Sequence, residues 1–384
     1  MVRAGLRIFV PLLLIVAVVA GFVVLDPLRS LTGAVPPVEV LTVERTVLDH
    51  DGIALRLRAG GSEPVQIAQV QVDGAYWQFT LDPPGPIARL QAVWLRLPYP
   101  WVLGEAHQLR LVTQSGASFD HAIDVAVATP AITGGLWRMF GLIGLFVGVV
   151  PVALGMLFYP ALRAGGAGSF RFALALTLGL LGFLLVDTLD EALEFAAEAA
   201  PALNGTVVVW LVVFATFAAL LAIGRRGGQA LEGLGLASAI ALGIGVHNFG
   251  EGLAIGAAFA TGSAALGSFL VLGFTLHNLT EGVGIVAPLV RLRPKLRVFA
   301  ALAALAGLPA VAGIWLGGYA LAPHWAALAF AIGAGAILQV IVEVGALLLR
   351  TDRRDGAAWL SAASLSGVTA GAVVMYATAL LVQI

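Results

Sequence analysis

Hydrophobic and polar positions divide the chain into three parts. An apolar run from Ile8 to Leu25 follows two arginines, which favours a retained membrane anchor over a cleaved secretory segment. From about residue 35 to 130, short segments alternate hydrophobic and polar side chains. The remainder is a succession of long apolar runs. We therefore predict an anchor within residues 1–30, a β-rich domain over 35–130 and a helical membrane domain over 136–384.

The middle part has the pattern of a small β-sandwich. Alternating segments are separated by turn residues such as Asp73-Gly74. About seven short strands of this kind are typical of an immunoglobulin-like sandwich, here without a disulfide because the chain has no cysteine. We assign this domain no chemistry, and its residues identify no partner. Four polar side chains that could meet a metal ion are interpreted as isolated surface residues: His50, Asp51, His107 and His121.

Eight apolar runs after residue 130 are each long enough for a transmembrane helix, which needs about 20 residues. Their approximate ranges are 136–158, 171–197, 206–223, 234–260, 264–290, 298–321, 325–349 and 358–382. Composition agrees, because 60% of the residues are hydrophobic and 11% charged, against roughly 45–50% and 25% in soluble domains. The chain is therefore an integral membrane protein, and the lipid bilayer is its surroundings.

The connectors between these runs alternate in charge. Lys and Arg collect on the cytoplasmic side of membrane proteins. The connectors that contain Arg163, Arg225, Arg291 and Arg350 are basic, whereas those near 198–205, 261–263 and 322–324 contain no Lys or Arg. This alternation predicts a multi-pass plasma-membrane protein with a cytoplasmic N-terminus and an extracytoplasmic β-domain and C-terminus. The formal net charge of −1 excludes the basic field that nucleic-acid binding requires.

Two matching polar motifs interrupt the fourth and fifth apolar runs. They are His247-Asn248-Phe249-Gly250-Glu251-Gly252 and His277-Asn278-Leu279-Thr280-Glu281-Gly282. In each, His and Glu are four residues apart and therefore share one helix face. The two histidines are 30 residues apart (277 − 247), with a short turn between the runs, so the motifs face each other at one depth on antiparallel helices. The glycines permit close helix approach.

Together the motifs supply a ligand set for a divalent cation. Two imidazoles, two carboxylates and two amide oxygens suit Zn²⁺, Fe²⁺, Mn²⁺ or Co²⁺, and two carboxylates neutralise one such ion. Interhelical hydrogen bonding is the alternative, at about 0.6–2 kcal/mol per contact. Hydrogen bonding alone accounts poorly for two matching motifs, because the burial of each charge in the membrane costs on the order of 2.5–3.5 kcal/mol, more than one such contact returns. The motifs therefore predict a metal site.

At these residues the chain resembles the ZIP family of divalent-metal transporters, particularly its prokaryotic branch, over residues 137–384. Further similarity lies in Asp187-Thr188-Leu189-Asp190-Glu191-Ala192-Leu193 and in Gly335-Ala336-Ile337-Leu338 followed by Glu343. The resemblance implies an all-α bundle of eight membrane helices, with inverted three-helix repeats around the fourth and fifth, and a homodimer. The resemblance also implies a primary metal site formed by His247, Glu251, His277 and Glu281. Asn248 and Asn278 would belong to an adjacent second site that shares the two glutamates.

Five more acidic residues lie within the apolar runs: Asp187, Asp190, Glu191, Glu194 and Glu343. Asp187 and Glu191 fall in the outer half of the second run, where they attract a cation at an entrance or form a solvated helix end. Glu343 lies toward the cytoplasmic end of the seventh run, as an exit ligand or as the partner of an Arg. Ala310 stands where many relatives carry a glutamate, which favours one bound ion over two.

The leading hypothesis is transport of a divalent metal, with Zn²⁺ favoured, toward the cytoplasm. The metal would be the substrate, and no organic cofactor or enzymatic activity is expected. One alternative is an intramembrane zinc hydrolase that uses one glutamate as general base. Another is a sensor that binds metal without transporting it, in which the β-domain recognises a partner.

Overall fold

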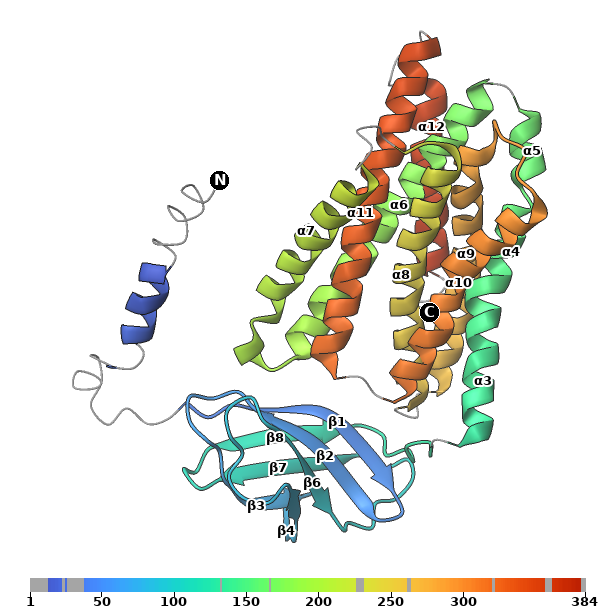
Figure 1. The fold of residues 1–384 in the computed structure, drawn as a ribbon. Helices are drawn as coiled ribbons and strands as arrows, with labels where there is room; N and C mark the ends of the chain where they lie inside the picture. The colour runs from blue at the N-terminus through green and yellow to red at the C-terminus, as the bar shows by residue number, and fades with distance from the viewer. Residues whose placement is uncertain are drawn as a thin grey trace.

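The computed structural model describes residues 13–22, 25, 38–131, 133–165, 167–225, 231–260, 264–319, 322–355 and 361–380. Within these ranges the chain forms a β-domain that lies against one end of a helical bundle (Figure 1). The described part of the predicted anchor is an apolar helix over Leu13–Phe22. Apart from Leu25, the other residues of that anchor lie outside the described ranges, so the anchor itself stays a prediction.

The β-domain consists of two four-stranded antiparallel sheets. Their strand orders are β1-β2-β6-β5 and β4-β3-β7-β8, which is the division of strands between the two sheets of immunoglobulin-like sandwiches. Eight strands are present in the described residues where about seven were predicted. Their bounds are β1 Leu41–Asp49, β2 Gly52–Ala59, β3 Ile67–Val72, β4 Ala75–Trp77, β5 Thr80–Asp82, β6 Ala92–Leu97, β7 His107–Thr113 and β8 Ser118–Ile123.

One of the four polar residues interpreted as lying on the surface of this domain is buried. His107 is 3% exposed, and its Nδ1 lies 2.8 Å from Asp73 Oδ2, so the surface interpretation was wrong for this residue. Asp73 also accepts hydrogen bonds from Tyr99 and from the Gln108 amide. The alternation along β7 puts His107 on the same side as the buried Leu109 and Leu111, so the period-two pattern already indicated an inward side chain.

The Asp73–His107 contact is expected to stabilise the sandwich in a pH-dependent way. Burial raises the pKa of Asp73, but hydrogen bonds from the Gln108 amide, His107 and Tyr99 outweigh it and leave this pKa below its ordinary value. The stabilisation is therefore present above the ordinary pKa of an aspartate, about 3.9, and is lost as the pH falls through the lowered value. Tryptophan-detected unfolding of the full chain should show a steeper loss of stability below about pH 4 for the wild type than for Asp73→Asn. Equal slopes would contradict this account.

The bundle contains eight helical spans, within the described residues, that are long and apolar enough to cross a membrane. This is compatible with a multi-pass membrane protein and agrees with the eight runs read from the sequence. The first span is built from α3 Gly134–Gly144, η1 Leu145–Val149, α4 Val150–Met156 and α5 Tyr159–Ala164. The others are α6 Ala167–Glu198, α7 Gly205–Gly224, α8 Gly233–Ala260, α9 Ala264–Val286, α10 Leu296–Gly318, α11 Pro323–Asp355 and α12 Ala362–Leu380, with short 3₁₀ turns η2 Pro201–Leu203 and η3 Ala287–Leu289.

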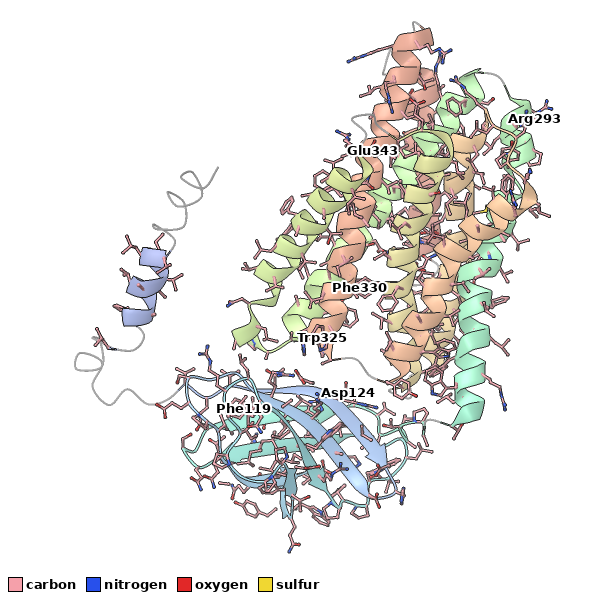
Figure 2. All side chains as sticks on the ribbon, in the orientation of Figure 1. Phe119, Asp124, Arg293, Trp325, Phe330 and Glu343 are labelled. Atoms are coloured by element: carbon pink, nitrogen blue, oxygen red, sulfur yellow. The ribbon has the colours of Figure 1, made fainter. Side chains whose placement is uncertain are left out.

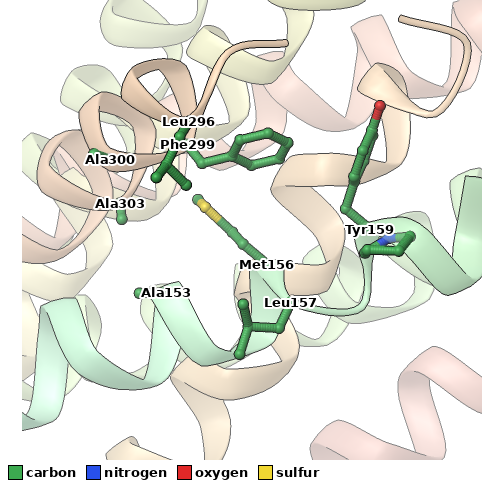
Figure 3. Close-up of a pocket in the computed structure, with 9 residues that line it drawn as sticks. Ala153, Met156, Leu157, Tyr159, Leu296, Phe299, Ala300 and Ala303 are labelled. Carbon is green, nitrogen blue, oxygen red and sulfur yellow. The ribbon is translucent and has the colours of Figure 1, made fainter. Parts of the chain in front are cut away.

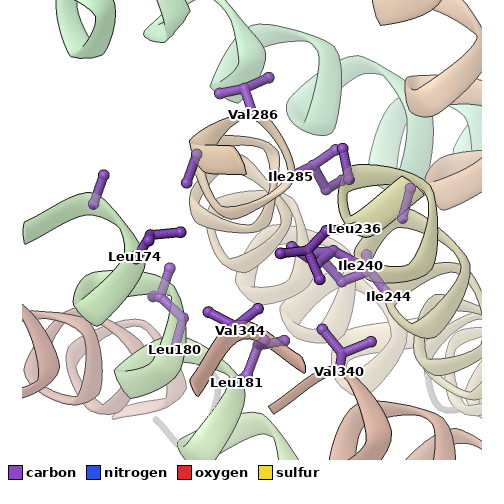
Figure 4. Close-up of a cluster of buried hydrophobic side chains, with 14 of the residues drawn as sticks. Leu174, Leu180, Leu181, Leu236, Ile240, Ile244, Ile285, Val286, Val340 and Val344 are labelled. Atoms are coloured by element: carbon purple, nitrogen blue, oxygen red, sulfur yellow. The ribbon is translucent and has the colours of Figure 1, made fainter. Parts of the chain in front are cut away.

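The helices that carry the two polar motifs, α8 and α9, lie inside the bundle. Their apolar faces meet α6 and α11 in one buried cluster that includes Leu181, Ile240, Ile285 and Val344 (Figure 4). Lipid tails are as apolar as these side chains, so close packing holds the cluster together more than the hydrophobic effect does. The motifs are thereby fixed between neighbours on all sides.

Glycines bring each motif helix against a neighbouring backbone. A Cβ atom added at Gly252 of α8 would overlap the Ala310 carbonyl oxygen of α10, and one added at Gly313 of α10 would overlap the Phe249 carbonyl oxygen. A Cβ atom added at Gly282 of α9 would likewise overlap the Val152 carbonyl oxygen of α4. The close approach expected from the glycines of the motifs is confirmed at Gly252 and Gly282. Small residues at such contacts are the usual means of helix association in membranes.

The β-domain contacts the bundle through β1. Arg45 donates a hydrogen bond to the Tyr319 carbonyl oxygen at the end of α10, over 3.0 Å. The Glu44 side chain is fully buried, receives hydrogen bonds from Arg58 and lies 3.6 Å from His324 Nδ1 in the first turn of α11. Trp325, beside His324, lies in Figure 2 at the end of α11 that faces the β-domain. A buried carboxylate shared between the two parts restricts their relative position.

Candidate metal centre

Three side chains from α8 and α9 converge in the interior of the bundle. His247, Glu251 and His277 each contribute one ligand atom, and these atoms all lie within 4.8 Å of one another. The three residues are at most 4% exposed. The imidazole rings of His247 and His277 are stacked, with ring centroids 5.8 Å apart. The helical spacing of each motif and the antiparallel pairing of α8 and α9 together produce this arrangement.

The distances between these atoms fit shared coordination of one ion. Oε1 of Glu251 lies 3.2 Å from Nε2 of His247 and 3.9 Å from Nε2 of His277. Two ligand atoms bound to Zn²⁺ at about 2.0–2.1 Å in tetrahedral geometry are separated by about 3.3 Å. Small side-chain movements therefore bring the atoms to coordinating positions. Oε1 of Glu281 lies 3.7 Å from Nε2 of His277 and is the nearby fourth group.

The amides of the motifs are anchored to neighbouring backbones in a symmetric manner. Asn248 donates to the Ala306 carbonyl oxygen of α10, and Asn278 donates to the Val147 carbonyl oxygen of η1, each over 3.1 Å. Asn278 also donates to Oε2 of Glu251 over 3.2 Å, which orients this carboxylate. The amide nitrogens thus hold α8 against α10 and α9 against η1. The amide oxygens take no part in these two hydrogen bonds.

Several buried polar atoms at the centre have no hydrogen-bond partner in the described part of the chain. They include Nε2 of His277 and the Oδ1 atoms of Asn248 and Asn278. A buried polar atom left without a partner costs about 1–3 kcal/mol. A bound cation would satisfy an imidazole nitrogen and amide oxygens at once, since all three atoms are electron-pair donors.

Thr188 of α6 is a functional candidate that the sequence reasoning did not single out. Its hydroxyl donates to the Leu184 carbonyl oxygen over 2.7 Å and lies 2.8 Å from Nδ1 of His247. Because the one hydroxyl proton is directed to Leu184, the hydroxyl oxygen accepts a hydrogen bond from Nδ1–H of His247. Nε2 of His247 is then unprotonated and faces Glu251, as a metal ligand must. The only signal in the sequence was the position of Thr188 next to Asp187 in an apolar run.

Replacing Thr188 by Val is expected to weaken metal binding about 10–100-fold, the usual effect of removing a group that orients a ligating histidine. The substitution keeps the shape of the side chain but removes the acceptor for Nδ1. Binding is measured by titration calorimetry of the detergent-purified protein with Zn²⁺. Thr177→Val is the matched control, because Thr177 is also buried and also donates to a carbonyl oxygen one turn before it, that of Ala173. Equal affinities for the two variants would contradict this role of Thr188.

An acidic face of α6 extends from the centre toward the β-domain. Asp187 interacts electrostatically with His247, and Glu191 with Glu251. Glu194 and Glu198 continue the same face at helical spacing. Beyond this face a cavity of about 350 Å³ separates the β-domain from the end of α6, and its lining includes Asp120, His121 and Glu198.

Glu343 does not join the centre. It is fully buried in α11, and its Oε1 accepts a hydrogen bond from Nε of Arg225 over 2.9 Å. Glu343 was expected to be either an exit ligand or the partner of an arginine. The structure contains the pair with Arg225. Figure 2 places Glu343 toward the end of the bundle remote from the β-domain.

A second group of potential ligands lies in the β-domain, at the turn between β1 and β2. Asp49, His50 and Asp51 have ligand atoms within 4.8 Å of one another. The side chains of His50 and Asp51 are 91% and 83% exposed, so nothing there excludes water. This turn is therefore a weaker site than the buried centre.

Compared with known proteins, the chain matches no family model and no curated sequence.

Proposed function

We propose that the protein transports a divalent transition-metal cation, with Zn²⁺ favoured, across the membrane through the centre formed by His247, Glu251 and His277. The observation that carries this proposal is the convergence of these three ligand atoms within 4.8 Å inside a bundle of membrane-length helices. A buried ionisable cluster at membrane depth is by default part of a substrate or ion pathway. Membership of the ZIP family, inverted repeats and a homodimer are part of the same proposal.

The direction of transport is proposed to be from the β-domain side toward the cytoplasm. The β-domain contacts the ends of α10 and α11, which adjoin a connector without Lys or Arg. Arg293, in a basic connector, lies at the opposite end (Figure 2). If Lys and Arg mark the cytoplasmic side, the cavity between the β-domain and α6 lies on the outer side of the membrane. The acidic face of α6 then runs from this cavity to the metal centre.

Hydrolysis within the membrane is less well supported. Three ligands with an adjacent carboxylate, Glu281, would suit a zinc hydrolase. The cavity that touches Glu281 measures about 10 Å³, however, which is room for about one water molecule. A peptide or lipid substrate would need a larger cavity to bring its scissile bond to the ion, whereas a dehydrated cation fits a cavity of this size.

An uptake screen with purified protein in liposomes tests the proposal. Zn²⁺, Fe²⁺, Mn²⁺, Co²⁺ and Cd²⁺ are offered separately, and the accumulated metal is counted. We expect uptake of at least one ion, Zn²⁺ first, above the level of a variant in which Glu251 and Glu281 are both replaced by Gln. Uptake of none of the five ions would overturn the proposal, and cleavage of lipid or peptide without metal flux would support the hydrolase instead.

A further inference from the structure

An apolar groove lies on the side of the bundle, near the end remote from the β-domain. It measures about 520 Å³, within the roughly 300–1,000 Å³ of typical ligand cavities. One wall comes from α4 and α5, the other from the first turns of α10 (Figure 3). The outer edges, Leu157 and Leu296, are 71% and 83% exposed, so the groove opens sideways.

The groove is held open by specific contacts. α4 ends at Met156 and α5 begins at Tyr159, and this interruption leaves space between the first span and α10. The Tyr159 ring packs edge-on against Phe299 across the groove, with centroids 5.0 Å apart. The Tyr159 hydroxyl and the Arg163 guanidinium both donate to the Leu292 carbonyl oxygen, which fixes the connector before α10 to α5.

The end of the groove is bordered by positive charge. Three exposed basic residues, Arg293, Lys295 and Arg297, surround Leu296 in the sequence. Both walls lie in stretches, 134–186 and 282–342, that contain no Asp or Glu. The acidic residue of a neighbouring element, Glu232, is 3.2 Å from Arg350 and forms an ion pair with it.

We propose that this groove binds one acyl chain of an anionic phospholipid, whose phosphate lies against Arg293, Lys295 and Arg297. The apolar walls suit a hydrocarbon chain, which is held there by close packing, because the surrounding lipid tails are as apolar as the walls. The cations at the mouth suit a phosphate, and the distribution of Lys and Arg places them at the anionic cytoplasmic leaflet. This site is separate from the metal centre and does not depend on transport.

Lipid titrations of the full-length protein in detergent test the site. The probes are phosphatidylglycerol and phosphatidylcholine with identical acyl chains, and the readouts are native mass spectrometry and the unfolding temperature. We expect phosphatidylglycerol to remain bound and to raise the unfolding temperature more than phosphatidylcholine does. The double substitution of Lys295 and Arg297 by Gln should lower the apparent affinity for phosphatidylglycerol about 30-fold, about fivefold for each cation.

Two further variants examine the groove itself. Ala153 and Ala300 are exposed in its walls, so Ala153→Phe and Ala300→Phe add a ring to the groove without displacing a buried atom. Each should reduce the binding of both lipids. The matched charge control replaces the exposed Arg353 and Arg354 in the last turn of α11 by Gln and should leave the lipid preference unchanged.

Three outcomes would overturn the site. The first is an equal response to the two lipids, as expected if any amphiphile, detergent included, fills the groove. The second is an equal loss of affinity in the two charge-reduced variants, which would indicate a nonspecific field. The third is unchanged phosphatidylglycerol binding in both phenylalanine variants.

Discussion

Replacing Glu251 by Gln is expected to reduce metal uptake to the level of protein-free liposomes while the protein remains folded. The carboxylate of Glu251 lies near both histidines, at 3.2 Å from His247 and 3.9 Å from His277. The amide removes the negative charge that compensates the cation in a medium where an uncompensated charge is costly. His247→Ala should have the same effect because it removes a ligand.

The control for this prediction is a carboxylate outside the centre. Glu63 is exposed in a loop of the β-domain, so Glu63→Gln makes the same chemical change without affecting the centre. Gel-filtration profiles and unfolding temperatures establish that all variants are folded. Wild-type rates in both Glu251→Gln and His247→Ala would exclude the centre from the transport path.

Replacing Gly313 by Ala is expected to destabilise the bundle strongly. The added methyl group would overlap the Phe249 carbonyl oxygen, so α8 and α10 must separate along the contact that also carries the Asn248–Ala306 hydrogen bond. Overpacking of this kind typically costs about 1–3 kcal/mol, and more where backbone must move. The measurement is the unfolding temperature in detergent, together with the yield of monodisperse protein.

Gly345 supplies the matched control, because a Cβ atom added there meets nothing within 4 Å. Gly345→Ala in the interior of α11 is expected to be neutral or stabilising by up to about 1 kcal/mol. The same substitution should therefore have opposite signs at the two glycines. Similar unfolding temperatures for the two variants would show that α8 and α10 are not in close contact in the folded protein.

The approach of the two motifs was predictable because it depends on local rules. Four-residue spacing puts His247 and Glu251 on one face, and the short connector before α9 forces antiparallel pairing with His277. The alternating pattern of the β-domain similarly predicted a sandwich, since period-two burial survives in most tertiary contexts. The lengths of the apolar runs predicted the eight spans, because the residue count that a helix needs to cross a membrane is also a local property of the sequence.

Other features depend on contacts between distant segments, and sequence spacing says little about those. Thr188 reaches His247 by a side-chain contact between two different helices, and the only signal in its own segment is its position next to Asp187. The partner of Glu343 is set by where α7 ends against α11, which places Arg225 beside it. The contact between Glu44 and His324 joins residues 280 positions apart (324 − 44), through the docking of two separately folded parts.

The β-domain and the bundle both border the proposed cation path. The cavity between β1, β8 and the end of α6 lies above the acidic face that leads to Glu191 and the centre. A cation that approaches from this side meets carboxylates before it meets the buried histidines. Steering of this kind raises the local cation concentration and weakens with salt, because exposed charges are screened within about 10 Å at 0.1 M.

The most direct test of the central claim is the time course of Zn²⁺ arrival in the lumen of liposomes that contain the purified protein and a trapped fluorescent indicator. We expect a luminal signal with the wild type that saturates with external Zn²⁺ and is absent with Glu251→Gln. Bound Zn²⁺ at His247, Glu251 and His277 without any luminal signal would contradict the claim, because the centre would then hold metal without passing it across the membrane.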